Sequence, residues 1–182
     1  MATENLRSGE RRNVTVLFSD MKGFTKLSEK MDPEEVDSLM NQIFSTFESI
    51  ICKYDGIVEK YIGDALVAVF GARHLHEDDA ARAVNAALNF LDEIKALGRT
   101  FAGREVELKF RTGVHTGLIA TGKRGDFDVV TGHAMSVASR LQEAALANTV
   151  LVSAATREKC ESDFLFGDEL ELKVKGKREP LK

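Results

Sequence analysis

The chain has 182 residues and a net charge of −4, with 43% hydrophobic and 30% charged residues. This length allows one domain with a sizeable core, and the composition is typical of a globular protein. The negative charge argues against broad nucleic-acid binding. The sequence has no apolar run as long as a membrane span and no signal peptide. The two cysteines, Cys52 and Cys160, indicate no disulfide framework or zinc site.

These features favour a reducing, cytoplasmic setting. Such a setting is compatible with a domain that belongs to a membrane-attached or multidomain protein. Residues 1–12 are polar, and we expect them to form a flexible N-terminal segment. We expect residues 13–182 to form one domain excised from a longer protein, because the chain stops soon after a predicted strand without a polar tail.

The first half of the chain predicts a strand, a crossover helix and a hairpin. Residues 13–19 form a short apolar run that predicts a buried strand. Residues 33–54 carry one apolar stripe at helical spacing, and Asp32 before a proline is typical of a helix start. Residues 57–62 and 66–70 are two apolar runs joined by a Gly-Asp turn, as in a hairpin.

The second half continues to alternate helices with strands. Helices are predicted at 76–97, 132–146 and 153–160, and strands at 127–130, 149–152 and 169–174. Residues 106–115 and 118–121 are predicted to form a second hairpin around a Thr-Gly turn. This alternation predicts an α/β sandwich with a mixed sheet.

Two aspartates carry the strongest functional signal. Asp20 follows the first predicted strand, and Asp64 lies in the turn of the first hairpin. A strand–helix–strand crossover normally makes the two strands parallel, so both aspartates are expected at the same edge of the sheet. A pair of carboxylates there can hold divalent cations over a polyphosphate. The sequence therefore predicts magnesium-assisted attack on a nucleotide.

Four short segments of the chain are distinctive, namely residues 18–25 (FSDMKGFT), 60–64 (KYIGD), 137–140 (VASR) and 175–177 (KGK). In this order they resemble the first metal motif, the second metal motif, the dimer-arm helix motif and the C-terminal phosphate-binding segment of the class III nucleotidyl cyclase catalytic domain. The resemblance implies a ferredoxin-like mixed sheet and a head-to-tail homodimer with shared active sites. It also implies cyclisation of a nucleoside triphosphate with two Mg²⁺ or Mn²⁺ ions per site.

The resemblance assigns metal binding to Asp20, Met21 and Asp64. It assigns phosphate contacts to Phe24 and Thr25, whose amides stand at a predicted helix start.

Lys60 matches the position that reads the purine across the dimer, and a lysine there resembles the adenine-specific pattern. Lys60 also alternates with Val58 and Ile62, so we expect it to share one strand face with these apolar residues. A lysine in such surroundings needs a partner or a ligand.

The adenine partner is less clear, because Asp128 lies one residue before the position that the family pattern gives, which here is Val129. Either the segment contains a one-residue insertion that restores Asp128, or the adenine partner is missing. A shift of one residue moves a side chain to the other face of a strand, so the two alternatives differ physically.

Ser136 departs from the family, which carries an asparagine four residues before the transition-state arginine matched by Arg140. A hydroxyl can donate one hydrogen bond but has a shorter reach than an amide. Lys175 is expected to meet the triphosphate, while for Lys177 a phosphate contact and a solvated terminal run remain equal alternatives.

The function expected from this resemblance is an adenylate cyclase that converts ATP to cyclic AMP and pyrophosphate. The alternative is a degenerate cyclase domain that binds nucleotide or dimerises to regulate a neighbour. Ser136 and the uncertain match of Asp128 motivate this alternative. A diguanylate cyclase ranks last, because the chain lacks that family's Gly-Gly-acidic-acidic-Phe hairpin.

Overall fold

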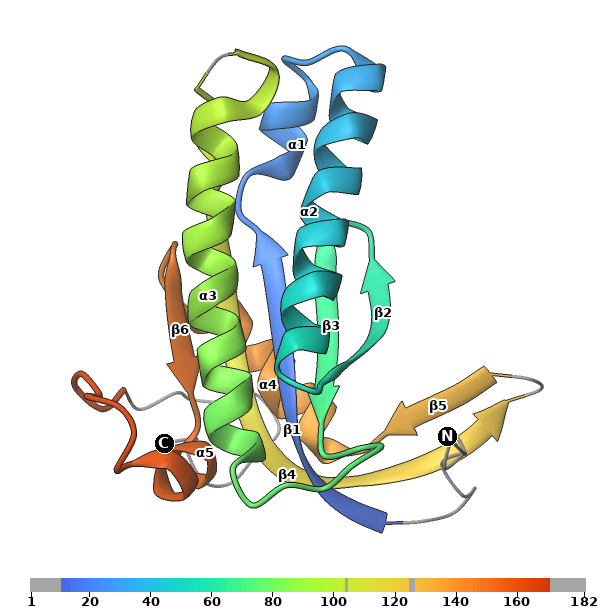
Figure 1. Ribbon diagram of the computed structural model, residues 1–182, viewed down its shortest axis with the longest axis vertical. Coiled ribbons are helices and arrows are strands. Elements are labelled where there is room, and N and C mark those ends of the chain that lie inside the picture. Colours follow the sequence, from blue (N-terminus) through green and yellow to red (C-terminus); the bar gives the residue numbers. More distant parts are fainter. Residues whose placement is uncertain (1–10, 104, 125–126, 171–182) are drawn as a thin grey trace.

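The computed structural model of the chain describes residues 11–103, 105–124 and 127–170. A mixed six-stranded sheet forms its centre, with strand order β2-β3-β1-β4-β5 and β6 paired to β4 (Figure 1). In chain order the elements are β1 Arg11–Met21, α1 Phe24–Ser28, α2 Pro33–Lys53, β2 Ile57–Ile62, β3 Ala65–Phe70, α3 Asp79–Thr100, β4 Phe110–Arg124, β5 Phe127–Thr131, α4 His133–Ala144, β6 Thr149–Val152 and α5 Ala154–Cys160. This confirms the predicted α/β sandwich with a mixed sheet.

The topology places the end of β1 beside the turn between β2 and β3. Strand β3 pairs antiparallel with both β1 and β2. Strands β1 and β2 are therefore parallel, as predicted, with β3 inserted between them in the split arrangement of ferredoxin-like folds. Figure 1 shows β1 ending and the β2–β3 hairpin turning at the same end of the sheet.

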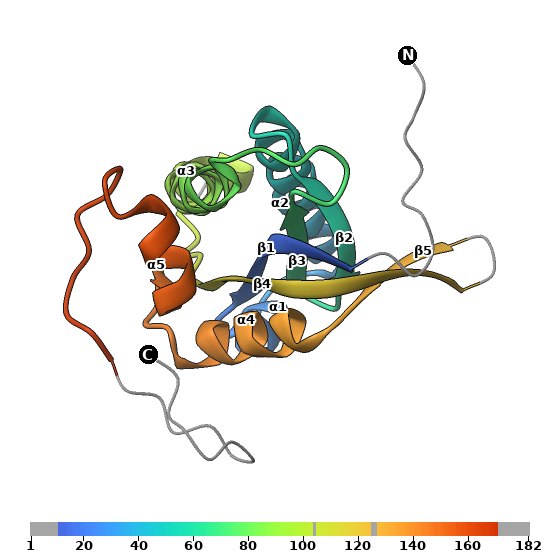
Figure 2. The same ribbon diagram turned by 90° about the horizontal axis from the view of Figure 1, so that it is seen from below.

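Helices cover both faces of the sheet. Helices α2 and α3 lie on one face and α4 lies on the other (Figure 2). The larger core, between the sheet and α2–α3, contains a chain of edge-to-face aromatic contacts from Phe47 through Phe90 to Phe110, with ring centroids 5.1 Å apart in each pair. The smaller core packs Ala134 and Ala138 of α4 against the opposite face.

Strand β4 corrects one prediction. The expected hairpin at 106–121 is wrong, because β4 is continuous and pairs with β1 through Thr116 and Gly117 without a break. A Cβ at Gly117 would lie 2.8 Å from His115 Nε2 and 3.3 Å from Ala134 Cβ. Gly117 thus permits close packing beneath α4 and does not mark a turn.

Other element boundaries differ by a few residues, as is usual for helix ends. Helix α3 begins at Asp79 and not at residue 76, and the His76 amide donates to the Asp79 carboxylate in the loop before the helix. Residues 169–170 are not in a strand, and residues 171–174 of the predicted edge strand lie outside the described part of the chain.

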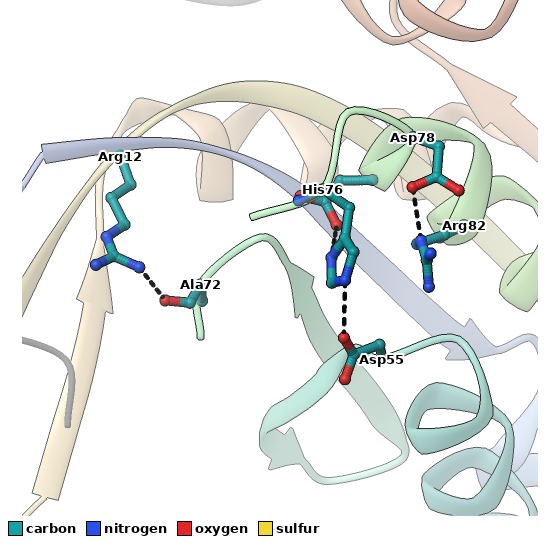
Figure 3. A network of polar contacts seen from close by, with 7 residues as sticks. Arg12, Asp55, Ala72, His76, Asp78 and Arg82 are labelled. Carbon is teal, nitrogen blue, oxygen red and sulfur yellow. Dashed lines mark hydrogen bonds and ion pairs between the residues drawn. The ribbon is translucent and has the colours of Figure 1, made fainter. Parts of the chain in front are cut away.

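Figure 3 shows how polar contacts hold the loop between β3 and α3. The imidazole of His76 lies between two carboxylates, with Nε2 3.1 Å from Asp55 Oδ2 and Nδ1 3.5 Å from Asp79 Oδ1. The His76 amide donates to Asp79 Oδ2 at 2.9 Å, and Arg12 donates to the carbonyl of Ala72 at 2.9 Å. These contacts tie the turn before β2 to the start of α3.

Candidate active site

Asp20 and Asp64 meet at the edge where β1 ends. Asp20 pairs in register with Ala65, the residue directly after Asp64. Asp64 stands in the two-residue turn after Gly63, whose φ of 63° suits glycine. Burial raises the pKa of the Asp64 carboxyl, its own backbone amide lowers it, and the charge of Asp20 raises it. The two carboxylates are therefore electrostatic neighbours, as the crossover predicts.

Two residues that the sequence analysis missed hold Asp20. Arg111 Nη2 donates to Asp20 Oδ2 at 2.6 Å, and Gln142 Nε2 donates to the same oxygen at 3.2 Å. Asp20 pairs with Arg111 in the β1–β4 register. Among the described residues, no hydrogen bond reaches Asp20 Oδ1, so this oxygen remains available to a ligand.

Gln142 reaches Asp20 because α4 packs directly on β4. A Cβ at Gly113 would overlap the amide nitrogen of Gln142 and the carbonyl oxygen of Ala138. Glycine at this position lets the helix backbone contact the strand. Gln142 is buried in this contact, so its amide stands at a fixed distance from the carboxylate.

The donor set at this edge suits a magnesium or manganese ion. Asp20 and Asp64 offer carboxylate oxygens, and Met21 has a buried side chain that leaves its backbone carbonyl as the ligand it can offer. No group of three or more histidine, cysteine, aspartate or glutamate side chains forms a metal site in the described ranges. Mg²⁺ is commonly held by one or two carboxylates together with substrate phosphates, so two aspartates fit its requirements.

Lys60 lies on the hairpin that carries Asp64, with its side chain 42% exposed. The predicted alternation of Lys60 with Val58 and Ile62 is wrong in part. A register shift between Val58 and Lys60 interrupts the strand, so Val58 packs on the main core and Lys60 does not. Ile62 remains exposed two residues after Lys60. The Lys60 ammonium lies 3.1 Å from Glu59 Oε2.

Ser136 and Arg140 stand apart from the aspartates of their own chain. Ser136 is exposed and Arg140 is half-buried on α4. Arg140 and Gln142 are two positions apart, or about 200° around a helix. Since Gln142 faces Asp20, Arg140 faces away from it. In the part of the chain that the structure describes, neither Ser136 nor Arg140 makes a side-chain hydrogen bond or ion pair.

The first helix begins where predicted, because Gly23 adopts φ 86° and α1 starts at Phe24. Phe24 is half-buried and Thr25 is exposed. Asp128 and Val129 both lie in β5, opposite Lys123 and Gly122, and the β4–β5 ladder has no register shift.

Lys175 and Lys177 lie outside the described residues. A cavity of about 840 Å³ lies at the other end of β1, lined by Arg12, Thr15 and residues 73–77 among others, and neither Asp20 nor Asp64 lines it. No helix among the described residues is long and apolar enough to cross a membrane.

Comparisons with known proteins agree with this geometry. The chain matches the adenylate and guanylate cyclase catalytic domain family over residues 6–182. It is 34% identical to the uncharacterized protein R02095 of Rhizobium meliloti, over 98% of this chain and 18% of that protein. The chain thus spans under a fifth of that relative's length.

Two solved structures are similar over nearly their whole length. The adenylyl cyclase CyaB from P. aeruginosa is 29% identical with a TM-score of 0.90, covering 96% of this chain and 93% of that one. The guanylate cyclase domain of RhGC from Catenaria anguillulae, in complex with GTP, is 27% identical with a TM-score of 0.86 and 94% coverage of both chains. Together with the family match, these similarities show that the chain belongs to the adenylate and guanylate cyclase catalytic domains, the class III nucleotidyl cyclases.

Proposed function

We propose that the domain is an adenylate cyclase that converts ATP to cyclic AMP and pyrophosphate at sites shared by two copies of the chain. The observation that carries this proposal is the apposition of Asp20 and Asp64 at the end of β1, with Lys60 on the same hairpin. A pair of hard oxygen ligands beside a cationic base reader suits a purine nucleoside triphosphate.

Asp20, Asp64 and the carbonyl of Met21 would hold Mg²⁺ or Mn²⁺. When bound, the two ions would lower the pKa of the ribose 3′-hydroxyl and neutralise the triphosphate and the leaving pyrophosphate. Arg111 and Gln142 fix the Oδ2 atom of Asp20, which leaves Oδ1 for this role. Preorganised ligands reduce the reorganisation needed when substrate arrives.

Adenine recognition in this proposal rests on Lys60. Its ammonium can donate a hydrogen bond to N1 of adenine, whereas N1 of guanine carries a proton and cannot accept one. Asp128 is the second candidate, but the regular β4–β5 ladder provides no bulge that would move it to the position of Val129. Lys60 therefore supplies the main discrimination between ATP and GTP.

The remaining groups would act from a second copy or at the phosphates. Arg140 faces away from the aspartates of its own chain, so we assign it to the α-phosphate in the site of the partner subunit. Its guanidinium fork suits phosphate in the transition state. Ser136, one helical turn before Arg140, would donate a single hydrogen bond with a shorter reach than an asparagine amide. The amides of Phe24 and Thr25, together with Lys175, would contact the triphosphate.

The direct test is incubation of purified protein with ATP or GTP and Mg²⁺ or Mn²⁺, followed by mass measurement of the cyclic products. Cyclic AMP formed in preference to cyclic GMP supports the proposal. Preference for GTP would contradict the role of Lys60. Nucleotide binding without a cyclic product would favour the degenerate regulatory domain, for which Ser136 is the supporting observation.

A further inference from the structure

Strand β2 contains a bulge next to the lysine that we propose reads the base. Val58 and Tyr61 both pack against the main core. In a regular strand, side chains on the same face are separated by one residue, but here Glu59 and Lys60 both lie between them. The register with β3 shifts between Val58 and Lys60. The extra residue is Glu59. A bulge re-aims side chains near functional sites and changes which neighbours they meet.

The bulge brings the side chains of Glu59 and Lys60 together. Their charged groups lie 3.1 Å apart, with the Glu59 side chain only 6% exposed and the Lys60 side chain 42% exposed. Glu59 Oε2 is buried and has no hydrogen bond that satisfies it. Within the described residues, the Lys60 ammonium is the only cation in ion-pair contact with Glu59.

The buried Glu59 carboxylate is stabilised by its contact with the Lys60 ammonium. Removal of Lys60 would leave the buried Glu59 carboxylate without its counter-charge, which is destabilising. An ammonium has three donors, so Lys60 can remain paired with Glu59 and still donate to another acceptor. The Lys60 side chain is partly exposed, so a ligand can reach the ammonium while the buried Glu59 carboxylate holds it.

We infer that Glu59 is a specificity-determining residue that acts through Lys60, holding the ammonium in position to meet the purine. The inference rests on the proposed base-reading role of Lys60. Glu59 and Lys60 then form one unit, and base preference depends on both. A glutamate placed at position 60 alone would stand beside the buried Glu59 carboxylate, and like charges repel.

The experiment compares wild type, Glu59→Gln, Lys60→Ala and the double variant. We expect Glu59→Gln to lower the ATP-to-GTP ratio of kcat/KM about fivefold, mainly by raising KM for ATP, because an ammonium without its carboxylate is less well held. We expect the same change to have no effect on the ratio in the Lys60→Ala background. Glu48→Gln is the matched control, because Glu48 contacts Tyr61 of the same strand but not Lys60.

Thermal unfolding gives a second readout that does not require activity. Lys60→Ala should lower the unfolding midpoint by leaving Glu59 unpaired, and adding Glu59→Gln should restore part of it. Adding Glu48→Gln to Lys60→Ala should restore nothing. This comparison remains informative if Lys60→Ala folds poorly, because the double variant removes the unpaired charge.

The outcomes separate the two proposals. If Lys60→Ala leaves the ATP-to-GTP ratio unchanged, the base-reading role itself is wrong. If Lys60→Ala changes the ratio but Glu59→Gln does not, Glu59 does not act through Lys60. The same conclusion follows if Glu59→Gln changes the ratio equally in the wild-type and Lys60→Ala backgrounds. We also expect Lys60→Glu with Glu59→Gln to use GTP about fivefold better than Lys60→Glu alone; equal use would contradict the paired unit.

Discussion

Arg111 of β4 pairs with Asp20 of β1 both in backbone register and through its side chain, with Nη2 2.6 Å from Asp20 Oδ2. The two side chains are 27% and 21% exposed, so the pair is partly shielded from water. Burial and the charge of Asp20 raise the pKa of Asp64, and the charge of Arg111 offsets part of this rise. One guanidinium thus moderates the repulsion between the two aspartates before any cation binds.

The aspartates themselves should be indispensable to turnover. We expect Asp20→Asn or Asp64→Asn to reduce cyclase activity at least about 100-fold, because each removes an anionic ligand worth several kcal/mol in the transition state. The circular dichroism spectrum should remain close to that of wild type, since asparagine at position 20 keeps an oxygen acceptor for Arg111 and Gln142 and Asp64 lies in a turn. Near wild-type turnover at saturating metal would show that the metal assignment is wrong.

Removal of Arg111 should shift the pH dependence of activity. In the proposed site, metal binding needs the deprotonated Asp64, and loss of Arg111 should raise the pKa of this carboxyl further, because the charge of Arg111 lowers it. With Mg²⁺ below saturation, activity falls as pH decreases through that pKa. The acidic limb of the Arg111→Gln profile should therefore lie at higher pH than that of wild type, and excess Mg²⁺ should move it back. Arg157→Gln, on α5, should leave the limb in place.

Shared sites should allow two inactive chains to complement each other. In a mixed dimer of Asp20→Asn and Arg140→Ala chains, one site carries both substitutions and the other carries neither. With random pairing, about half of the dimers are mixed, so roughly a quarter of wild-type activity should return. Demonstrated heterodimers without activity would contradict the placement of Arg140 in the partner's site.

The sequence predicted the elements that depend on local pattern. The apolar stripe of α2, its start at Pro33 and the turn that contains Asp64 are local features, and the structure contains them. Their topology was enough to place Asp20 and Asp64 at one edge. Arg111 was missed because its contact with Asp20 depends on the register of two strands 91 residues apart.

Glycine explains the main error in the fold. A Thr-Gly pair is typical of a turn, but Gly117 lies in a continuous strand. The space left by its missing side chain is filled by His115 and α4. The bulge at Glu59 was also invisible, since residues 57–62 still read as one regular strand in composition. Both features depend on what packs against the strand, which no local pattern contains.

Asp79 should make stability depend on pH. Burial raises the pKa of its carboxyl. The hydrogen bond from the His76 amide and the charge of His76 lower this pKa, but by less, so the net shift is upward. The folded chain therefore binds more protons than the unfolded chain as pH rises above the ordinary pKa of aspartate. Stability from this group is present at lower pH and lost as pH rises through the raised pKa. Asp79→Asn keeps an acceptor for the His76 amide, so it should gain stability relative to wild type across this range. A constant difference in the free energy of unfolding from urea titrations would contradict this.

Ser136→Asn should raise turnover without changing base choice. Ser136 is exposed and lies one helical turn before Arg140 on α4. In the proposed site, this turn faces the reacting ribose and phosphate of the partner subunit, not the purine. An amide reaches farther than a hydroxyl and gives a second donor in the transition state, so kcat should rise roughly tenfold. Because the gain belongs to the transition state, KM and the ATP-to-GTP ratio of kcat/KM should stay near wild type. Ala155→Asn, at an exposed position of α5, is the control and should leave kcat unchanged. An unchanged kcat in Ser136→Asn, measured at saturating ATP and Mn²⁺, would place this position outside the reacting centre.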